Sequence, residues 1–128
     1  MSTTGLKIFF DGGCRPNPGM METAVVARGS CYHRPDCGTG TNNDAEWLAL
    51  IHATNIALSI GAMDVVLLGD SALVVGQANG IAKCRTASLR PLMEQFQFLE
   101  TQFDRLRIRR VSRSQNLAGI ALARMRQF

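Results

Sequence analysis

The chain has 128 residues, of which 19% are charged and 46% are hydrophobic, and its formal net charge is +4. This composition is typical of one globular domain, here residues 1–128, and excludes a disordered chain. The mild positive charge allows a polyanionic partner without requiring one. No apolar run reaches the roughly 20 residues of a membrane span, and the first residues lack the basic region and cleavage site of a signal peptide. We therefore expect a cytoplasmic protein with no membrane partner.

The first half of the chain predicts three strands followed by a helix. Apolar runs bounded by Gly and Asp residues indicate strands at residues 6–10, 23–28 and 31–38. Residues 44–60 have helical periodicity, with Asn42 or Asn43 as the expected N-cap and Gly61 as the end.

The second half predicts helices that alternate with two further strands. Residues 64–69 form a continuous apolar run, which is typical of a strand buried on both faces. A short helix is expected at 71–77, a longer one from its cap at Ser88 to about 103, a strand at 106–111 and a last helix at 115–126. This order predicts an α/β fold with a five-stranded mixed sheet, three antiparallel strands then two parallel ones, and helices on both faces.

Three acids are expected to meet at one edge of that sheet. Asp11 and Asp70 each follow an apolar strand directly, and Glu46 lies in the first turn of the helix between those strands. If the two strands are parallel neighbours, their carboxyl ends share an edge, where α/β sheets keep their sites. Clustered carboxylates repel each other unless a cation binds them, and hard oxygen ligands favour Mg²⁺ or Mn²⁺. Each acid could equally be placed by the local preferences of strand ends and helix N-termini.

The four cysteines are expected to be free thiols, as in most cytoplasmic proteins. Cys31, His33 and Cys37 lie close enough in sequence to suggest a zinc site. However, a structural zinc needs four ligands, and this spacing matches no common pattern. Unpaired thiols on a hairpin are therefore favoured over zinc.

The residues around the acids carry a family resemblance. The stretches DGGCRPNPG (11–19), TNNDAEW (41–47) and GDSALVVGQANG (69–80) resemble the three signature blocks of the type 1 ribonuclease H family, in the same order. The resemblance covers nearly the whole chain and is to the compact subtype that lacks the basic protrusion. It implies a ribonuclease H-like fold and hydrolysis of the RNA strand of RNA–DNA hybrids with two divalent ions, Mg²⁺ or Mn²⁺. Asp11, Glu46 and Asp70 match the metal-binding catalytic residues.

The resemblance also implies residues that bind substrate. Asn17, Asn42 and Asn43 match polar residues that touch the minor groove, where amides can hydrogen-bond to 2′-hydroxyls. We add Arg15, from the same loop as Asn17, and Asn116, whose main expected role is to cap the last helix. Arg113 stands where other subtypes have a catalytic histidine and is expected to bind the scissile phosphate or assist product release. It could equally be a surface arginine of an arginine-rich strand. The expected partner is an RNA–DNA hybrid, with double-stranded RNA as a second candidate, and the protein is expected to be a monomer.

The last motif of the family departs from its pattern in this chain. The pattern V-x-R-x-x-N-x-x-A-D-x-L-A is matched at Val111, Arg113, Asn116, Leu122 and Ala123, but Ile120 replaces the fourth aspartate. No acid follows Asp104, so the gap is not a matter of alignment. The expected consequence is weakened activity, with a preference for Mn²⁺ or high metal concentration.

Two other functions remain open. A degenerate domain that binds hybrid or double-stranded RNA without cutting would explain Ile120, and the last 24 residues, with seven arginines and no acid, suit phosphate binding. A DNA exonuclease or integrase-type core would share the fold, but the loop motifs favour ribonuclease H. The histidines suggest no proton shuttle, and His52, on the apolar side of its helix, is expected in the core.

Overall fold

The computed structural model describes residues 5–126. Its strands are β1 (Leu6–Cys14), β2 (Gly19–Ala27), β3 (Ser30–Arg34), β4 (Thr39–Gly40), β5 (Asp64–Gly69) and β6 (Arg105–Arg110). Its α-helices are α1 (Asn42–Ser59), α2 (Ala72–Ala78), α3 (Arg90–Glu100) and α4 (Leu117–Met125), and two short 3₁₀ turns cover Ala87–Leu89 and Arg113–Gln115. Within this range, no helix combines the length and apolar character needed to cross a bilayer.

The sheet confirms the expected mixed α/β architecture. Its strand order is β3-β2-β1-β5-β6, in which β1, β2 and β3 pair antiparallel while β1, β5 and β6 pair parallel. One short strand was not expected: β4 pairs with the beginning of β2. It begins just after the strand predicted over 31–38, of which only β3 forms, because β3 stops just before Pro35 and the chain then turns. Proline cannot donate to a strand ladder, which accounts for the early end of β3.

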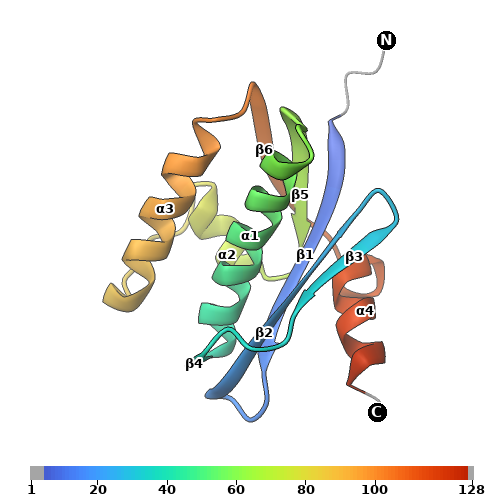
Figure 1. Ribbon diagram of the computed structural model, residues 1–128. Coiled ribbons are helices and arrows are strands. Elements are labelled where there is room, and N and C mark those ends of the chain that lie inside the picture. The colour runs from blue at the N-terminus through green and yellow to red at the C-terminus, as the bar shows by residue number, and fades with distance from the viewer. Residues whose placement is uncertain (1–4, 127–128) are drawn as a thin grey trace.

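Helices cover both faces of the sheet, as expected. In Figure 1, α1, α2 and α3 lie on one side of the sheet and α4 lies on the other. The main core fills the first side and contains Trp47 and Phe96, whose rings meet edge to face with centroids 6.2 Å apart. The indole Nε1 of Trp47 donates a 2.9 Å hydrogen bond to Gln77 of α2. This packing ties α1, which carries Glu46, to α2 and α3.

His52 lies inside the protein, as expected from its place on the apolar side of α1. Its Nδ1 lies 2.9 Å from the hydroxyl of Thr23, and both residues are buried. Burial, together with the nearby positive charge of Arg34 and His33, lowers the pKa of His52 to about 4. The imidazole is therefore neutral at pH 7 and serves as a packed core group.

Two expected helix caps are wrong. Thr41, not Asn42 or Asn43, caps α1, because its hydroxyl accepts from the N–H of Asp44 while the Asp44 carboxylate accepts from the N–H of Thr41. This reciprocal pair satisfies two backbone donors at once and leaves both asparagines inside the first turn. Ser88 makes no capping hydrogen bond in the described chain, because it lies within a 3₁₀ turn that continues into α3.

Candidate active site

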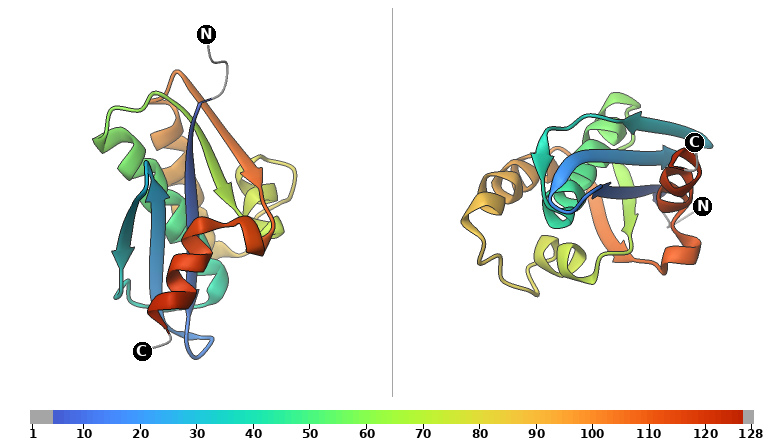
Figure 2. Two further views of the ribbon diagram at one scale, coloured as in Figure 1. Left: turned by 90° about the vertical axis from the view of Figure 1, so that its right-hand side faces the viewer. Right: turned by 90° about the horizontal axis from the view of Figure 1, so that it is seen from below.

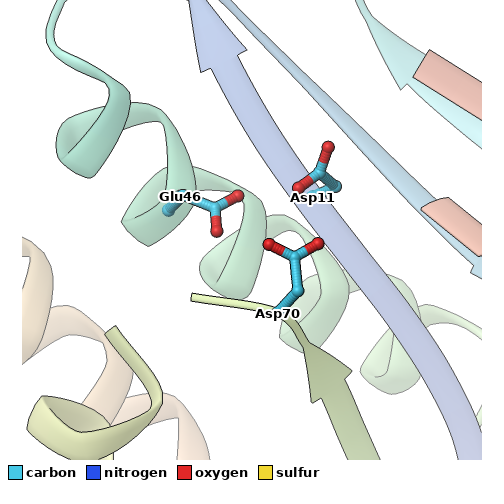
Figure 3. A group of neighbouring side chains, drawn as sticks. All are labelled: Asp11, Glu46 and Asp70. Carbon is cyan, nitrogen blue, oxygen red and sulfur yellow. The ribbon is translucent and has the colours of Figure 1, made fainter. Parts of the chain in front are cut away.

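Three carboxylates converge where β1, β5 and α1 meet. Asp11 lies within β1, Asp70 directly follows β5, and Glu46 extends from the first turns of α1. Each contributes an oxygen that lies within 4.8 Å of the others, and no other cluster of potential metal ligands is found among residues 5–126. Figure 3 shows the three side chains pointing toward one another. The parallel pairing of β1 with β5 produces this convergence, as the sequence predicted.

The close approach of α1 to β1 depends on a glycine. A Cβ on Gly12 would collide with the carbonyl of Ala45, so a larger residue would push α1 away from the strand. The backbone N–H of Gly12 also donates a 2.6 Å hydrogen bond to Oε1 of Glu46. The DGG sequence therefore does more than end a strand: β1 continues through it to Cys14 and holds Glu46 beside Asp11.

Burial and mutual repulsion raise the pKa of two of these acids. Burial raises the pKa of Glu46, which is only 6% exposed, and the negative charge of Asp11 raises it further. Burial also raises the pKa of Asp11, as does the charge of Asp70, although a hydrogen bond from Glu46 opposes the shift. In the metal-free protein the pair therefore retains a proton that ordinary carboxyl groups have lost at neutral pH. A divalent cation would replace this proton, so the oxygen donor set fits a hard metal ion.

The acids lie in an open cleft of about 710 Å³. Seven of the nine residues predicted as site residues line it; the two exceptions are Asn17 and Asn116. The remaining wall comes from β1, the residues after β5 and the inner face of α4. The lining residues are Asp11, Gly12, Gly13, Cys14, Arg15, Asn42, Asn43, Glu46, Asp70, Ser71, Ala72, Arg113, Gly119, Ile120, Ala123 and Arg126.

Asn17 and Asn42 are held together beside the cleft. The side-chain oxygen of Asn17 accepts from the backbone N–H of Asn42, at 3.1 Å. The side-chain oxygen of Asn42 accepts in turn from the backbone N–H of Cys14, also at 3.1 Å. Both residues are exposed, as are Arg15 and Asn43. The structure thus brings the loop after β1 and the start of α1 into one polar rim.

Asn116 has the capping role that was expected of it and also contacts one of the acids. It caps α4 as expected, with its side-chain oxygen accepting from the N–H groups of Ala118 and Gly119. Its amide nitrogen donates directly to Oδ2 of Asp70, at 2.9 Å, and to the carbonyl of Phe10, at 3.0 Å. Asn116 is fully buried, so the expectation that it contacts substrate is wrong. It is a positioning residue that orients Asp70.

Replacing Asn116 by alanine is expected to destabilise the protein by about 1 kcal/mol through loss of the cap. It should also weaken divalent-metal binding about tenfold, because Asp70 loses the partner that orients it. Asn116→Ser is the matched variant, since serine can cap the helix but is too short to reach Asp70. Urea unfolding and metal titration should show serine restoring stability but not metal affinity. Equal metal affinity in the unchanged protein and both variants would show that Asn116 only caps the helix.

Two arginines bring positive charge to the acids. The Nε of Arg113 lies 4.0 Å from Oδ1 of Asp70, and its side chain is 93% exposed, which suits a group that meets a ligand. Sequence reasoning missed Arg126, whose Nε donates to Glu22 at 3.2 Å and whose charge lowers the pKa of Asp11 against the stronger effect of burial. The Nη2 of Arg126 is buried without a hydrogen-bond partner in the described residues. The only sequence signal for it was the arginine-rich tail.

Ile120 lies in the wall of the cleft, at the first turns of α4. A Cβ on its neighbour Gly119 would lie 3.5 Å from Oδ2 of Asp11 and 3.7 Å from Oδ2 of Asp70. This part of α4 therefore faces the carboxylates directly. The apolar Ile120, next to Gly119, lines the same cleft.

The suggested zinc site is not assembled. His33 pairs with Glu22, with its Nε2 3.1 Å from Oε1 of that residue. All four cysteines, which lie within the described residues, are free thiols, as the sequence predicted.

Comparison with known proteins identifies relatives over most of the chain. A family model described as "Reverse transcriptase-like" matches residues 10–126. The Ribonuclease HI of Halobacterium salinarum is 36% identical over 124 residues, which are 90% of this chain and 60% of that protein. The Bifunctional protein Rv2228c of Mycobacterium tuberculosis is 35% identical over 119 residues, which are 88% of this chain. The chain spans only 33% of the length of that mycobacterial relative.

Solved structures share the fold. The RNase H1 of Halobacterium salinarum superposes with a TM-score of 0.83 at 33% identity, covering 91% of this chain and 92% of that one. The N-terminal RNase H domain of Rv2228c from Mycobacterium tuberculosis gives 0.80 at 32% identity, with 98% of both chains covered. LC11-RNase H1, solved in complex with RNA/DNA hybrid, gives 0.79 at 25% identity, with 91% of this chain and 92% of that one covered.

Proposed function

This chain belongs to the ribonuclease H family, and on that basis we propose that it hydrolyses the RNA strand of RNA–DNA hybrids. The observation that carries the proposal is the convergence of Asp11, Glu46 and Asp70 in an open cleft. A structural relative that was solved with an RNA/DNA hybrid supports the choice of substrate.

The residues of the cleft would have separate roles in this reaction. Asp11, Glu46 and Asp70 would hold two divalent cations, Mg²⁺ or Mn²⁺. When bound, these ions supply a water of lowered pKa and stabilise the charge that develops on the phosphate. The Gly12 N–H orients Glu46, and Asn116 orients Asp70. Arg113, exposed and beside Asp70, would contact the scissile phosphate.

The polar rim would bind the hybrid. Hydrogen bonds fix the side-chain oxygens of Asn17 and Asn42, and their amino groups can then donate to 2′-hydroxyls in the shallow minor groove. Asn43 and Arg15 extend the same rim. We expect the protein to act on this substrate as a monomer.

The apolar side chain of Ile120 is the reason why we propose a low level of activity. An apolar side chain offers no ligand, so the cation on that side of the site would depend on Asp11, substrate oxygens and water. We therefore propose weakened catalysis, with a need for Mn²⁺ or high metal concentration. The alternative, a domain that binds hybrid or double-stranded RNA without cutting, is favoured by Ile120 itself. Against it, three metal-free carboxylates would repel a polyanion at the centre of its binding cleft.

A cleavage assay on hybrid, double-stranded RNA and double-stranded DNA, each with Mg²⁺, Mn²⁺ or EDTA, tests the proposal. Metal-dependent cutting of the RNA strand of the hybrid alone is the expected result. Binding of hybrid without cutting in any metal would select the alternative. Cutting of double-stranded DNA would place the chain with the DNA nucleases that share its fold.

Metal binding is expected to release a proton at neutral pH. Burial raises the pKa of Glu46 and of Asp11, so a cation must displace the proton that the pair holds. Affinity should then rise up to about tenfold per pH unit from pH 6 upward. Calorimetric titration of metal at several pH values, in buffers of different ionisation enthalpy, measures both effects. A pH-independent affinity would contradict metal binding by these two groups.

The same raised pKa values determine in which direction stability changes with pH in the absence of metal. The folded protein holds a proton that the unfolded chain loses near its ordinary carboxyl pKa, about 4. The stabilisation that this bound proton gives the folded protein is therefore complete below about pH 4. It is lost as the pH rises through the raised pKa of the folded state. In metal-free buffer the free energy of unfolding should include this decrease, and Asp11→Asn should reduce it by removing the Asp11 carboxyl and its charge beside Glu46.

A further inference from the structure

Strand β6 carries a row of arginines on one face. Its pairing with β5 places Arg107 opposite Val66 and Arg109 opposite Leu68. Leu106 and Ile108 belong to the main core. Because successive side chains of a strand point to opposite faces, Arg105, Arg107 and Arg109 lie on the other face of the sheet. We call these three residues the arginine row.

That face is open over β5 and β6. Among residues 5–126, α4 is the α-helix on this side, and it packs on β1 and β2. Its contacts there are made by Ala118 and Leu122, against a small apolar cluster of the two strands. The left view of Figure 2 shows α4 crossing β1 and β2, while most of β5 and β6 lies clear of it. Arg105 and Arg109 are exposed, and the Arg107 side chain is 22% exposed.

Positive charge dominates this open face. The register adds Lys7 of β1, which lies opposite Val66 and is exposed. Beside the row, β5 places Asp64 on the same face, and its Oδ1 lies 3.6 Å from Nη2 of Arg107. Nε and Nη2 of Arg107 are buried without a hydrogen-bond partner in the described chain. Those two atoms are closed to a ligand, so the donors that this face offers an anion are those of the exposed Lys7, Arg105 and Arg109.

The row leads toward the catalytic cleft. β6 ends at Arg110, whose Nε donates to the carbonyl of Asp70 at 3.2 Å, and Arg113 follows beside the Asp70 carboxylate. Alternate residues of a strand are about 6.7 Å apart. A nucleic-acid strand presents its phosphates in a comparable repeating row, and arginine binds phosphate with several donors at once.

We propose that the arginine row is a second contact surface for a phosphate backbone, outside the cleft. It binds a single strand of nucleic acid that continues from the duplex held at the carboxylates. This proposal rests on the proposed function for the identity of the substrate. Charges on an edge strand can also serve only to prevent pairing with another sheet, and the experiment separates the two roles.

The test compares Arg105→Gln/Arg109→Gln with the matched control Arg34→Gln/Arg124→Gln. The control removes the same charge from exposed positions on β3 and α4. The Arg107–Asp64 pair stays intact in both. Fluorescence anisotropy in EDTA, where no cleavage takes place, measures binding to a short hybrid and to the same hybrid with a single-stranded extension at either end. Each titration is repeated at several salt concentrations.

The row variant should bind one extended probe about tenfold more weakly at 0.1 M salt, with the slope of log affinity against log salt reduced by about 1.4. Its binding to the short hybrid, and all binding by the control, should be unchanged. Equal losses on both probes, or equal losses in the control, would overturn the proposal. So would unchanged binding together with self-association on gel filtration, which would assign the row to edge protection. Cleavage of the short hybrid is measured separately, so a failure of the proposed function remains distinguishable.

Discussion

Asp11→Asn is expected to reduce metal-dependent cleavage of the hybrid at least about a thousandfold, equivalent to about 4 kcal/mol of transition-state stabilisation. Asp11 belongs to the carboxylate cluster, hydrogen-bonded to Glu46 and close to Asp70. Asparagine keeps the shape of the side chain but loses the charge that holds a cation. The measurement is kcat/KM for hybrid cleavage over a range of Mg²⁺ and Mn²⁺ concentrations.

This variant should not lose stability, which separates catalysis from folding. Burial of the Asp11 carboxylate is unfavourable, as its raised pKa shows, so the metal-free variant should unfold at the same or a higher urea concentration. Asp104→Asn is the matched control, because Asp104 is exposed just before β6 and away from the cleft lining. Its activity should equal that of the unchanged protein. Cleavage that survives in Asp11→Asn and still requires metal would refute the assignment of the metal site.

Ile120→Asp is expected to raise kcat/KM about a hundredfold at low metal concentration, or to lower the metal requirement by a similar factor. The loss of an outer partner of a metal ligand typically costs 10- to 100-fold, so the gain of a direct ligand should count for at least as much. The position favours the change, because Ile120 lines the cleft on a helix whose neighbouring residue faces Asp11 and Asp70. An acid in the first turns of a helix is also favourable.

Ile120→Asn distinguishes charge from size. Asparagine has the shape of aspartate without its charge, so it should give little of the gain. The aspartate variant should be less stable than the unchanged protein without metal, because a fourth carboxylate joins three that already repel, and metal should raise its Tm more. If the aspartate variant gains neither activity nor metal affinity, Ile120 does not stand in for a lost ligand.

The sequence predicted features that depend on local signals. The apolar run 64–69 is β5 to the residue, because a strand bounded by a glycine and an aspartate needs no distant information. The placement of Asp11 and Asp70 at one edge followed from the strand order and the rule for parallel neighbours. Where two local signals competed, as at Thr41 and the asparagines after it, the sequence could not choose between equally good caps.

The structure decided what depends on residues far apart in the chain. Asn116 and Asp70 are 46 positions apart, and only the docking of α4 on the sheet turns a helix cap into a partner of an acid in the cleft. Arg126 reaches the cleft for the same reason, through a contact with Glu22 across 104 positions. The pKa of Glu46 is raised by burial and by the charge of Asp11, which together outweigh the hydrogen bond from the Gly12 N–H that lowers it. Sequence patterns report which groups a segment offers, whereas burial, charge and hydrogen-bond partners arise only when separate segments pack together.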